Sequence, residues 1–98
     1  MILEFEWDEE KETINQMKHG VSFEEAKMVF YDPKQVEIFD LEHSFFEDRW
    51  KVIGLAGVII LTVSFTERDG FIRIISARKA DKDEEEEYFY GYSTGNGN

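Results

Sequence analysis

Three strand-like segments with very short connections most constrain the fold of this 98-residue chain. They span residues 49–55, 58–66 and 71–78 and are rich in Val, Ile, Thr and Phe. Ala56-Gly57 separates the first two, and a turn that closes with Asp69-Gly70 separates the last two. Parallel neighbours need crossover connections of about a dozen residues or more, so these segments are predicted to form an antiparallel meander.

The N-terminal segment predicts one strand followed by a helix. Residues 3–7 alternate apolar and acidic side chains, which is typical of a half-buried strand. Asp8 is a suitable N-cap for a helix that runs to about Lys18. Gly20 is expected to end that helix, because glycine adopts the left-handed conformation at little cost.

A second helix is predicted immediately afterwards. Ser22 and Glu25 have the spacing of a capping box, and the segment must end before Pro33 because proline disfavours helical geometry in the preceding residue. Residues 35–41 alternate weakly and predict a further strand.

The C-terminal part predicts a helix over residues 81–89 and a disordered polar tail over residues 91–98. The expected order is β-α-α-β-β-β-β-α in a single domain of residues 1–90. This order predicts an α+β fold, a small antiparallel sheet with its helices packed on one face.

Composition excludes several classes of function. The chain has no Cys, so disulfides and thiolate chemistry are excluded. Its two His residues lack metal-ligand spacing, and neither a metal nor a cofactor is expected. The longest apolar run, residues 58–61, is too short to span a bilayer, and no secretory segment opens the chain, so a cytoplasmic protein without a membrane partner is expected.

Charge is strongly segregated along the chain. The net formal charge is −11, yet residues 49–79 hold six basic and two acidic residues, a local charge of +4. A protein with this distribution can present an anion-binding face despite its acidic total.

Alternation along residues 71–78 places the basic side chains. In a regular strand Arg73 and Arg78 point to opposite faces, unless a bulge or the strand end re-aims Arg78. Arg49 and Lys51 share a face, and Arg68 lies at the hairpin turn. The set could clamp a phosphodiester, although any single Arg could equally be an exposed residue that balances a nearby acid.

The titratable residues outside these strands leave alternatives open. His19 ends a predicted helix, where it could act as a general acid or base or could satisfy free carbonyl groups. His43 lies in a loop. Glu47 and Asp48 could perform acid–base work, hold a divalent cation, or pair with a neighbouring Arg. The acidic run 81–87 could be a solvated helix face, a surface for a basic partner, or a shield over the basic strand.

Several spaced motifs in this order resemble the BrnT-type toxins of type II toxin–antitoxin systems. They are Phe5-Glu6-Trp7-Asp8, Asn15, Lys18-His19-Gly20-Val21-Ser22-Phe23, Glu25-Ala26, Val29-Phe30, Asp32-Pro33, His43-Ser44, Glu47-Asp48-Arg49, Ile53-Gly54, Thr66-Glu67-Arg68 and residues 72–80. The resemblance covers residues 5–80 and continues to Glu84 and Tyr88.

This resemblance implies a RelE-like fold and a small endoribonuclease that cleaves RNA without a metal. It also implies a cognate ribbon-helix-helix antitoxin that neutralises the toxin. DNA would then be contacted only through the antitoxin, and a dimeric antitoxin would bring two toxin copies together.

The resemblance also suggests roles for individual residues. Arg73 and Arg78 are predicted to contact phosphate and stabilise transition-state charge, and His19 or Glu47 to transfer protons. The supporting RNA contacts are assigned to Arg49, Lys51, Arg68, Lys18 and Lys79.

One departure from the family pattern supplies an alternative function. Residues 81–87 are acidic where the family usually continues with a basic helix, and an acidic helix would repel RNA. The alternative is a catalytically weak or inactive toxin-like protein that only binds an antitoxin.

Overall fold

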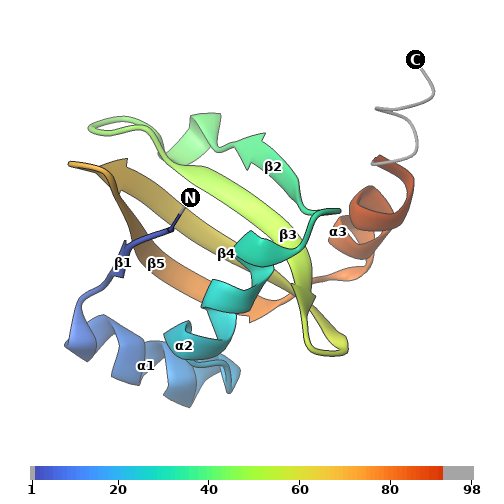
Figure 1. The fold of residues 1–98 in the computed structure, drawn as a ribbon, viewed down its shortest axis with the longest axis horizontal. Helices are drawn as coiled ribbons and strands as arrows, with labels where there is room; N and C mark the ends of the chain where they lie inside the picture. Colours follow the sequence, from blue (N-terminus) through green and yellow to red (C-terminus); the bar gives the residue numbers. More distant parts are fainter. Residues whose placement is uncertain (1, 92–98) are drawn as a thin grey trace.

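The computed structural model describes residues 2–91 and shows a five-stranded sheet with helices packed against it (Figure 1). The elements in chain order are β1 Phe5–Glu6, α1 Glu9–His19, α2 Phe23–Ala26, the 3-10 helix η1 Lys27–Tyr31, β2 Val36–Phe39, the 3-10 turn η2 Leu41–His43, β3 Trp50–Ala56, β4 Ile59–Arg68, β5 Phe71–Lys79, α3 Lys82–Glu86 and the π-helical turn η3 Glu87–Gly91. The predicted mixed α+β class is confirmed. The predicted disordered tail falls almost entirely on residues 92–98, which lie outside the described part of the chain.

The sheet combines the predicted meander with one parallel strand. Its order is β1-β5-β4-β3-β2, and β2 to β5 pair antiparallel with their neighbours in sequence, as predicted. The short β1 instead pairs parallel with β5, with Phe5 opposite Ile72 and Glu6 opposite Arg73. The sequence analysis did not predict this parallel pair, because the connection between the two strands spans most of the domain.

The two N-terminal helices begin and end as their capping residues predict. The Asp8 carboxylate accepts hydrogen bonds from two amides of the first turn of α1, and Gly20 ends that helix with φ 69°. Ser22 and Glu25 form both hydrogen bonds of the capping box at α2. The second helix is only four residues long before it tightens into η1, so the predicted single helix is divided.

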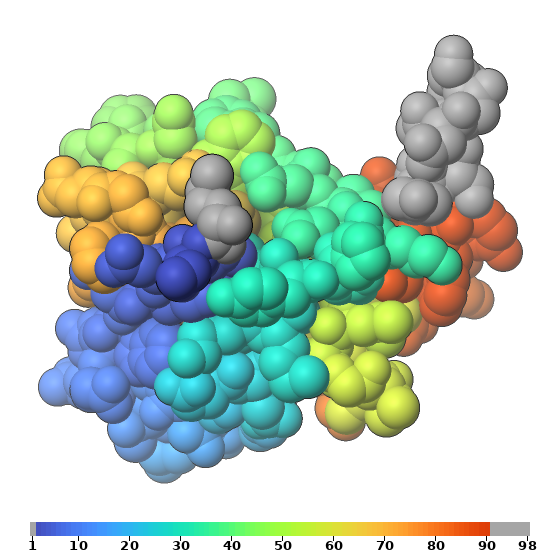
Figure 2. All heavy atoms as spheres, viewed as in Figure 1, coloured from blue at the N-terminus to red at the C-terminus, as the bar shows by residue number. Residues whose placement is uncertain are grey.

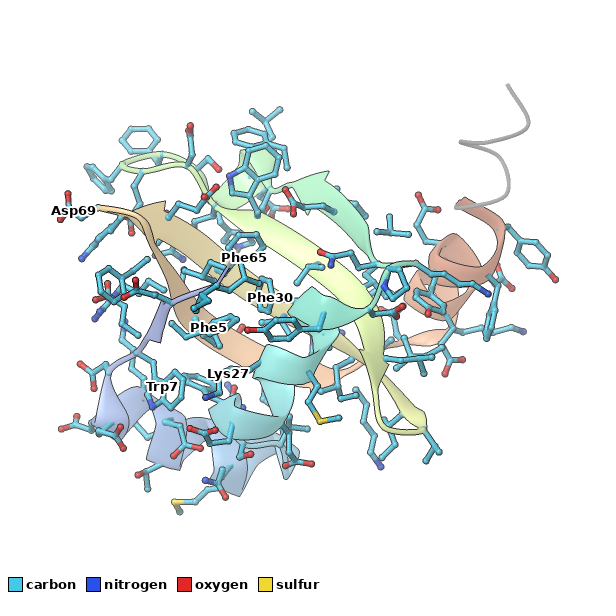
Figure 3. The ribbon with its side chains drawn as sticks, in the orientation of Figure 1. Phe5, Trp7, Lys27, Phe30, Phe65 and Asp69 are labelled. Atoms are coloured by element: carbon cyan, nitrogen blue, oxygen red, sulfur yellow. The ribbon has the colours of Figure 1, made fainter. Side chains whose placement is uncertain are left out.

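The hydrophobic core lies between α2–η1 and one face of β3, β4 and β5. Phe23, Val29, Val52 and Val63 are fully buried there. A row of aromatic rings extends this core toward β1: the ring centroids of Phe30 and Phe65 lie 5.0 Å apart, and those of Phe5 and Phe30 lie 5.3 Å apart, in edge-on arrangements. Figure 3 shows these rings between η1 and the sheet.

α1 and α2–η1 lie in front of the sheet in Figure 1, and their blue and cyan atoms cover its lower front in Figure 2. Lys27 holds its ammonium group 5.7 Å from the ring centroid of Trp7, over the edge of the same core. No helix in the described residues is long and apolar enough to cross a membrane.

The C-terminal segment reaches a different part of the sheet. α3 starts with a capping box between Asp81 and Glu84, and Tyr88 donates a 2.6 Å hydrogen bond to the Asp32 carboxylate at the end of η1. Glu84 bonds Arg78, whose side chain lies on the sheet face opposite the core. The helices therefore do not all contact one face. The RelE-like fold expected from the resemblance stays a prediction.

Asn15 joins α1 to the edge of β5. Its amide group donates to the carbonyl of Ala77 at 2.8 Å and accepts from the Ala77 amide at 3.1 Å, and it also donates to the carbonyl of Val21 at 2.9 Å. Asn15 is 6% exposed. The side chain thus satisfies backbone groups that β1 leaves unpaired, because β1 stops opposite Arg73.

We predict that Asn15→Ala lowers the free energy of unfolding by about 2–4 kcal/mol, because buried backbone groups lose their partners. Urea denaturation followed by circular dichroism measures this change. The control is Thr13→Ala on the exposed side of α1, which is expected to change stability by less than about 1 kcal/mol. Equal stability of the two variants would contradict the role assigned to Asn15.

Candidate active site

A β-bulge in β5 brings Arg73 and Arg78 to the same face of the sheet. Ser64 pairs with Ser76 while Phe65 pairs with Ile74, so Ile75 has no opposite residue on β4. Ile74 and Ala77 consequently both face the core, although they are three residues apart. The expected opposition of the two arginines applied only to a regular strand, and the strand is bulged.

The face opposite the core carries a depression that we call the basic hollow, with a volume of about 270 Å³. Its lining comes from β3, β4, β5 and the β2–β3 loop, and consists of Asp40, His43, Arg49, Lys51, Ser64, Ile75, Ser76 and Arg78. Lys51, Ser64 and Ser76 form a row across three strands, since Lys51 pairs with Ser64 and Ser64 with Ser76. Three cationic side chains and one carboxylate make this site suited to an anion.

His43 and Asp40 form a hydrogen-bonded pair at one side of the basic hollow. The Asp40 carboxylate lies 2.9 Å from His43 Nδ1 and caps the turn of η2. Burial opposes the charge of Asp40, but the hydrogen bonds from His43 and the charge of Lys51 outweigh it, and the pKa of Asp40 is lowered. Because the ionised Asp40 engages Nδ1, Nε2 is the ring nitrogen left to exchange a proton with a ligand.

The loop that carries His43 is tied together by Ser44. The Ser44 hydroxyl donates to the Asp40 carbonyl at 2.6 Å and accepts from the Arg49 amide at 2.9 Å. These bonds hold the two ends of the loop against each other. The positions of His43 and Arg49 in the basic hollow therefore depend on each other.

Arg78 is held by an acidic residue of α3. Its two terminal nitrogens lie 2.7 and 2.9 Å from the two carboxylate oxygens of Glu84, in the two-pronged geometry that arginine favours. Burial alone would raise the pKa of Glu84, but the hydrogen bonds from Arg78 and the Asp81 amide lower it to about 2. One residue of the acidic run 81–87 thus pairs with the basic strand.

Two other predicted arginines are engaged outside the basic hollow. Arg68 lies 3.0 Å from a carboxylate oxygen of Glu47, and Arg73 lies 3.4 Å from a carboxylate oxygen of Glu6 on β1. Neither Glu47 nor these arginines line the hollow. Lys79 lines a separate depression near Val58, at the turn between β3 and β4.

Lys18 and His19 line a neighbouring depression between α1 and β5. Ile75 and Ser76 contribute to both depressions, so the two sites adjoin at the bulge. Of the predicted site residues, Arg49, Lys51 and Arg78 therefore line the basic hollow, while Lys18 and His19 lie beside it.

The sequence analysis did not assign Asp40, Ser64, Ser76 or His43 to the site. The spacing of Asp40 three residues before His43 is the pattern of a side-chain-capped turn, and it was the one available signal for this pair. Ser64 and Ser76 could be found only from the register of β4 and β5. No group of three or more His, Asp or Glu side chains suited to a metal ion occurs within residues 2–91.

We predict that Glu84→Gln lowers the free energy of unfolding at pH 7 by about 1–3 kcal/mol, because Arg78 loses a charged partner. The folded-state pKa of Glu84 is about 2, against 4.5 ordinarily. Its ionisation therefore stabilises the fold above about pH 5, and this stabilisation is lost as the pH falls toward about 2. Urea denaturation across this range should show the two proteins converging in stability. Glu86→Gln, on the exposed side of α3, is the matched control. If this control were destabilised at pH 7 as strongly as Glu84→Gln and also approached the wild type at low pH, the role assigned to the Glu84–Arg78 pair would be contradicted.

One comparison with known proteins agrees with the sequence resemblance. A family profile described as "Ribonuclease toxin, BrnT, of type II toxin-antitoxin system" matches residues 7–84. A comparison with curated proteins found no match. The match begins at Trp7, just after β1, and extends through β5 to Glu84, so it includes every residue of the basic hollow. The chain belongs to the BrnT family of ribonuclease toxins of type II toxin–antitoxin systems.

Proposed function

We propose that this protein is a metal-independent endoribonuclease whose active site is the basic hollow. The observation that carries the proposal is the convergence of Arg49, Lys51 and Arg78 with the His43–Asp40 pair around one depression. Membership of a family of ribonuclease toxins supports RNA as the substrate. Three cations can hold a phosphodiester without a metal ion, and a histidine oriented by a carboxylate can move a proton.

The proposed reaction uses the 2′-hydroxyl of the RNA as the nucleophile. His43 accepts the proton of this hydroxyl as its oxygen bonds to phosphorus, the bond from phosphorus to the 5′ oxygen breaks, and solvent water protonates the leaving oxygen. Arg49, Lys51 and Arg78 stabilise the charge that grows on the phosphoryl oxygens. Asp40 keeps Nε2 of His43 free to accept the proton and stabilises the imidazolium.

This proposal gives proton transfer to His43 in place of His19 and Glu47. Glu47 is engaged by Arg68, and His19 lies in the adjoining depression. Glu84 is proposed as a positioning residue, since it fixes the guanidinium of Arg78 beside the hollow. Arg73 and Arg68 are proposed to contribute long-range electrostatic attraction for RNA. Lys79 is proposed to contribute the same attraction from the separate depression near Val58.

A specific observation favours the alternative, an antitoxin-binding protein with weak or no catalysis. Both terminal nitrogens of Arg78 bond Glu84, so they are not free to form a bidentate contact with a phosphate. The run 81–87 is also acidic. RNA must then compete with an internal carboxylate for Arg78. Cleavage of RNA by the pure protein at low salt separates the two functions.

The family implies an antitoxin partner. We propose that this partner is a ribbon-helix-helix protein that neutralises the toxin in the cytoplasm. The complex would then contact DNA through the antitoxin, and the antitoxin dimer would hold two toxin chains. The adjacent open reading frame tests this proposal, because it should encode a short basic protein of that type.

We predict that His43→Ala and Arg78→Ala each reduce RNA cleavage by about a hundredfold or more, because each removes a group that acts in the transition state. Cleavage of a labelled RNA by the purified proteins measures the rates, and growth arrest after induction gives a second readout. Lys34→Ala, at an exposed site outside both depressions, is the control and should retain wild-type rates. Circular dichroism must show that each variant is folded. Unchanged cleavage by folded His43→Ala and Arg78→Ala would disprove the assigned site.

Asp40→Asn tests the pairing on which the proposed base depends. An amide in place of the carboxylate cannot stabilise a protonated His43, so the rate is expected to fall by about tenfold or more and the rise of the pH–rate profile to shift toward lower pH. A purely structural role for Asp40 would lower the rate without moving the profile. The measurement is the rate of cleavage between about pH 5 and 9, with Glu42→Gln in the same loop as the control.

A further inference from the structure

We propose that the depression between α1 and β5, which we call the α1 hollow, binds the nucleotide next to the phosphodiester held in the basic hollow. The α1 hollow has a volume of about 190 Å³ and is lined by Lys11, Ile14, Asn15, Lys18, His19, Ile75 and Ser76. The inference rests on the proposed function, since it assumes that the basic hollow receives RNA. It adds a binding site for a flanking nucleotide to the site of cleavage.

The two hollows adjoin at the bulge of β5, where Ile75 and Ser76 line both of them. β1 covers this edge of β5 as far as Arg73, and Asn15 of α1 pairs with the edge again at Ala77, so Ile75 and Ser76 lie between these two contacts. A polynucleotide is a linear chain of repeating anionic units, and it is the kind of ligand that can occupy two adjoining sites of this sort at once.

The lining residues of α1 combine cations with an apolar surface. Lys11, Ile14 and Lys18 are spaced three and four residues apart, so they lie on one face of the helix. Ile14 is 53% exposed, and neither lysine forms an ion pair within the described residues. An apolar wall from Ile14 and Ile75 suits the flat face of a base, while the two ammonium groups suit the phosphates on either side of it.

The floor of the α1 hollow is fixed before any ligand arrives. Asn15, between Ile14 and Lys18 on α1, is buried and hydrogen-bonded to both backbone groups of Ala77. Gly20 then ends the helix immediately after His19. A preformed floor reduces the conformational entropy that binding would otherwise cost.

The charges of α1 favour an anion at this end of the helix. Its acidic residues Glu9, Glu10 and Glu12 lie in the first turn, whereas Lys18 and His19 lie in the last turn. An acidic segment of a protein partner would be attracted by the same cations. RNA is favoured over such a segment because the α1 hollow adjoins the basic hollow, whose three cations are proposed to bind a phosphodiester.

The test measures binding of a non-cleavable RNA to the full-length chain. The probe is a fluorescein-labelled hexanucleotide of mixed sequence with 2′-O-methyl groups, followed by anisotropy at several salt concentrations, and a nucleoside 3′-monophosphate serves as the short ligand. The variant Lys11→Ala/Lys18→Ala should bind the hexanucleotide at least about tenfold more weakly at about 50 mM salt and lower the salt slope by about 1.4. Its affinity for the monophosphate should stay unchanged, because that ligand fills only the basic hollow.

Two further variants separate the apolar contribution of Ile14 from the effect of net charge. Ile14→Ser should weaken hexanucleotide binding several-fold and leave the salt slope unchanged, because the lost contact is apolar. Lys34→Ala/Lys82→Ala removes the same charge outside both hollows and should bind as the wild type does, apart from a small effect of net charge. Thermal unfolding checks that each variant is folded.

Each outcome decides one question. If the Lys11/Lys18 variant binds no worse than the Lys34/Lys82 control while Arg78→Ala loses binding, the α1 hollow is not a nucleotide site and the proposed function stands. If a hexaglutamate peptide binds the wild type as tightly as the hexanucleotide, the α1 hollow is a protein-binding site and the inference is overturned. If the wild type neither cleaves RNA nor binds either probe, the proposed function fails, and the subsite fails with it.

Discussion

The pairing of the Asn15 amide with the backbone of Ala77 is the interaction on which the site most depends. It supplies β5 with hydrogen bonds at an edge that the two-residue β1 cannot cover. It also fixes α1 against the strand that contributes Ile75, Ser76 and Arg78. The β-bulge at Ile75 sets the direction of these side chains. The buried Asn15 and the extra residue of the bulge therefore together determine where the basic hollow and the α1 hollow meet.

The structure of the sheet shows where the basic residues of the segment 49–79 lie. Within residues 49–79, Arg49, Lys51 and Arg78 line the hollow. Arg68, Arg73 and again Arg78 form ion pairs with Glu47, Glu6 and Glu84. Pairing of this kind holds long side chains in fixed positions around the hollow. The net charge of −11 says little about the site itself, because a total does not show where the basic side chains gather.

Sequence reasoning recovered the elements that depend on local chemistry. The caps at Asp8 and Ser22, the end of α1 at Gly20 and the meander of β2 to β5 follow from residue types at short spacing. The parallel pairing of β1 with β5 did not, because it joins residues more than sixty positions apart and leaves no local pattern. The sequence indicated only that a bulge would change the direction of Arg78. The position of the bulge at Ile75 depends on the register between β4 and β5, which no local pattern predicts. His43 was left outside the site for a related reason, since its partner Asp40 acts through a turn whose orientation depends on the rest of the sheet.

The parallel pair of β1 and β5 has a consequence for the time at which the protein becomes active. A contact between the first and last strands forms late, because the intervening chain must be ordered or at least present before the two can meet. Arg78 and Glu84 follow β1 by most of the length of the domain, so a ribosome must release nearly all of the described residues before the basic hollow can exist. The N-terminal helices can therefore form during synthesis before the basic hollow exists, and any chemistry of the hollow must wait until β5 has docked.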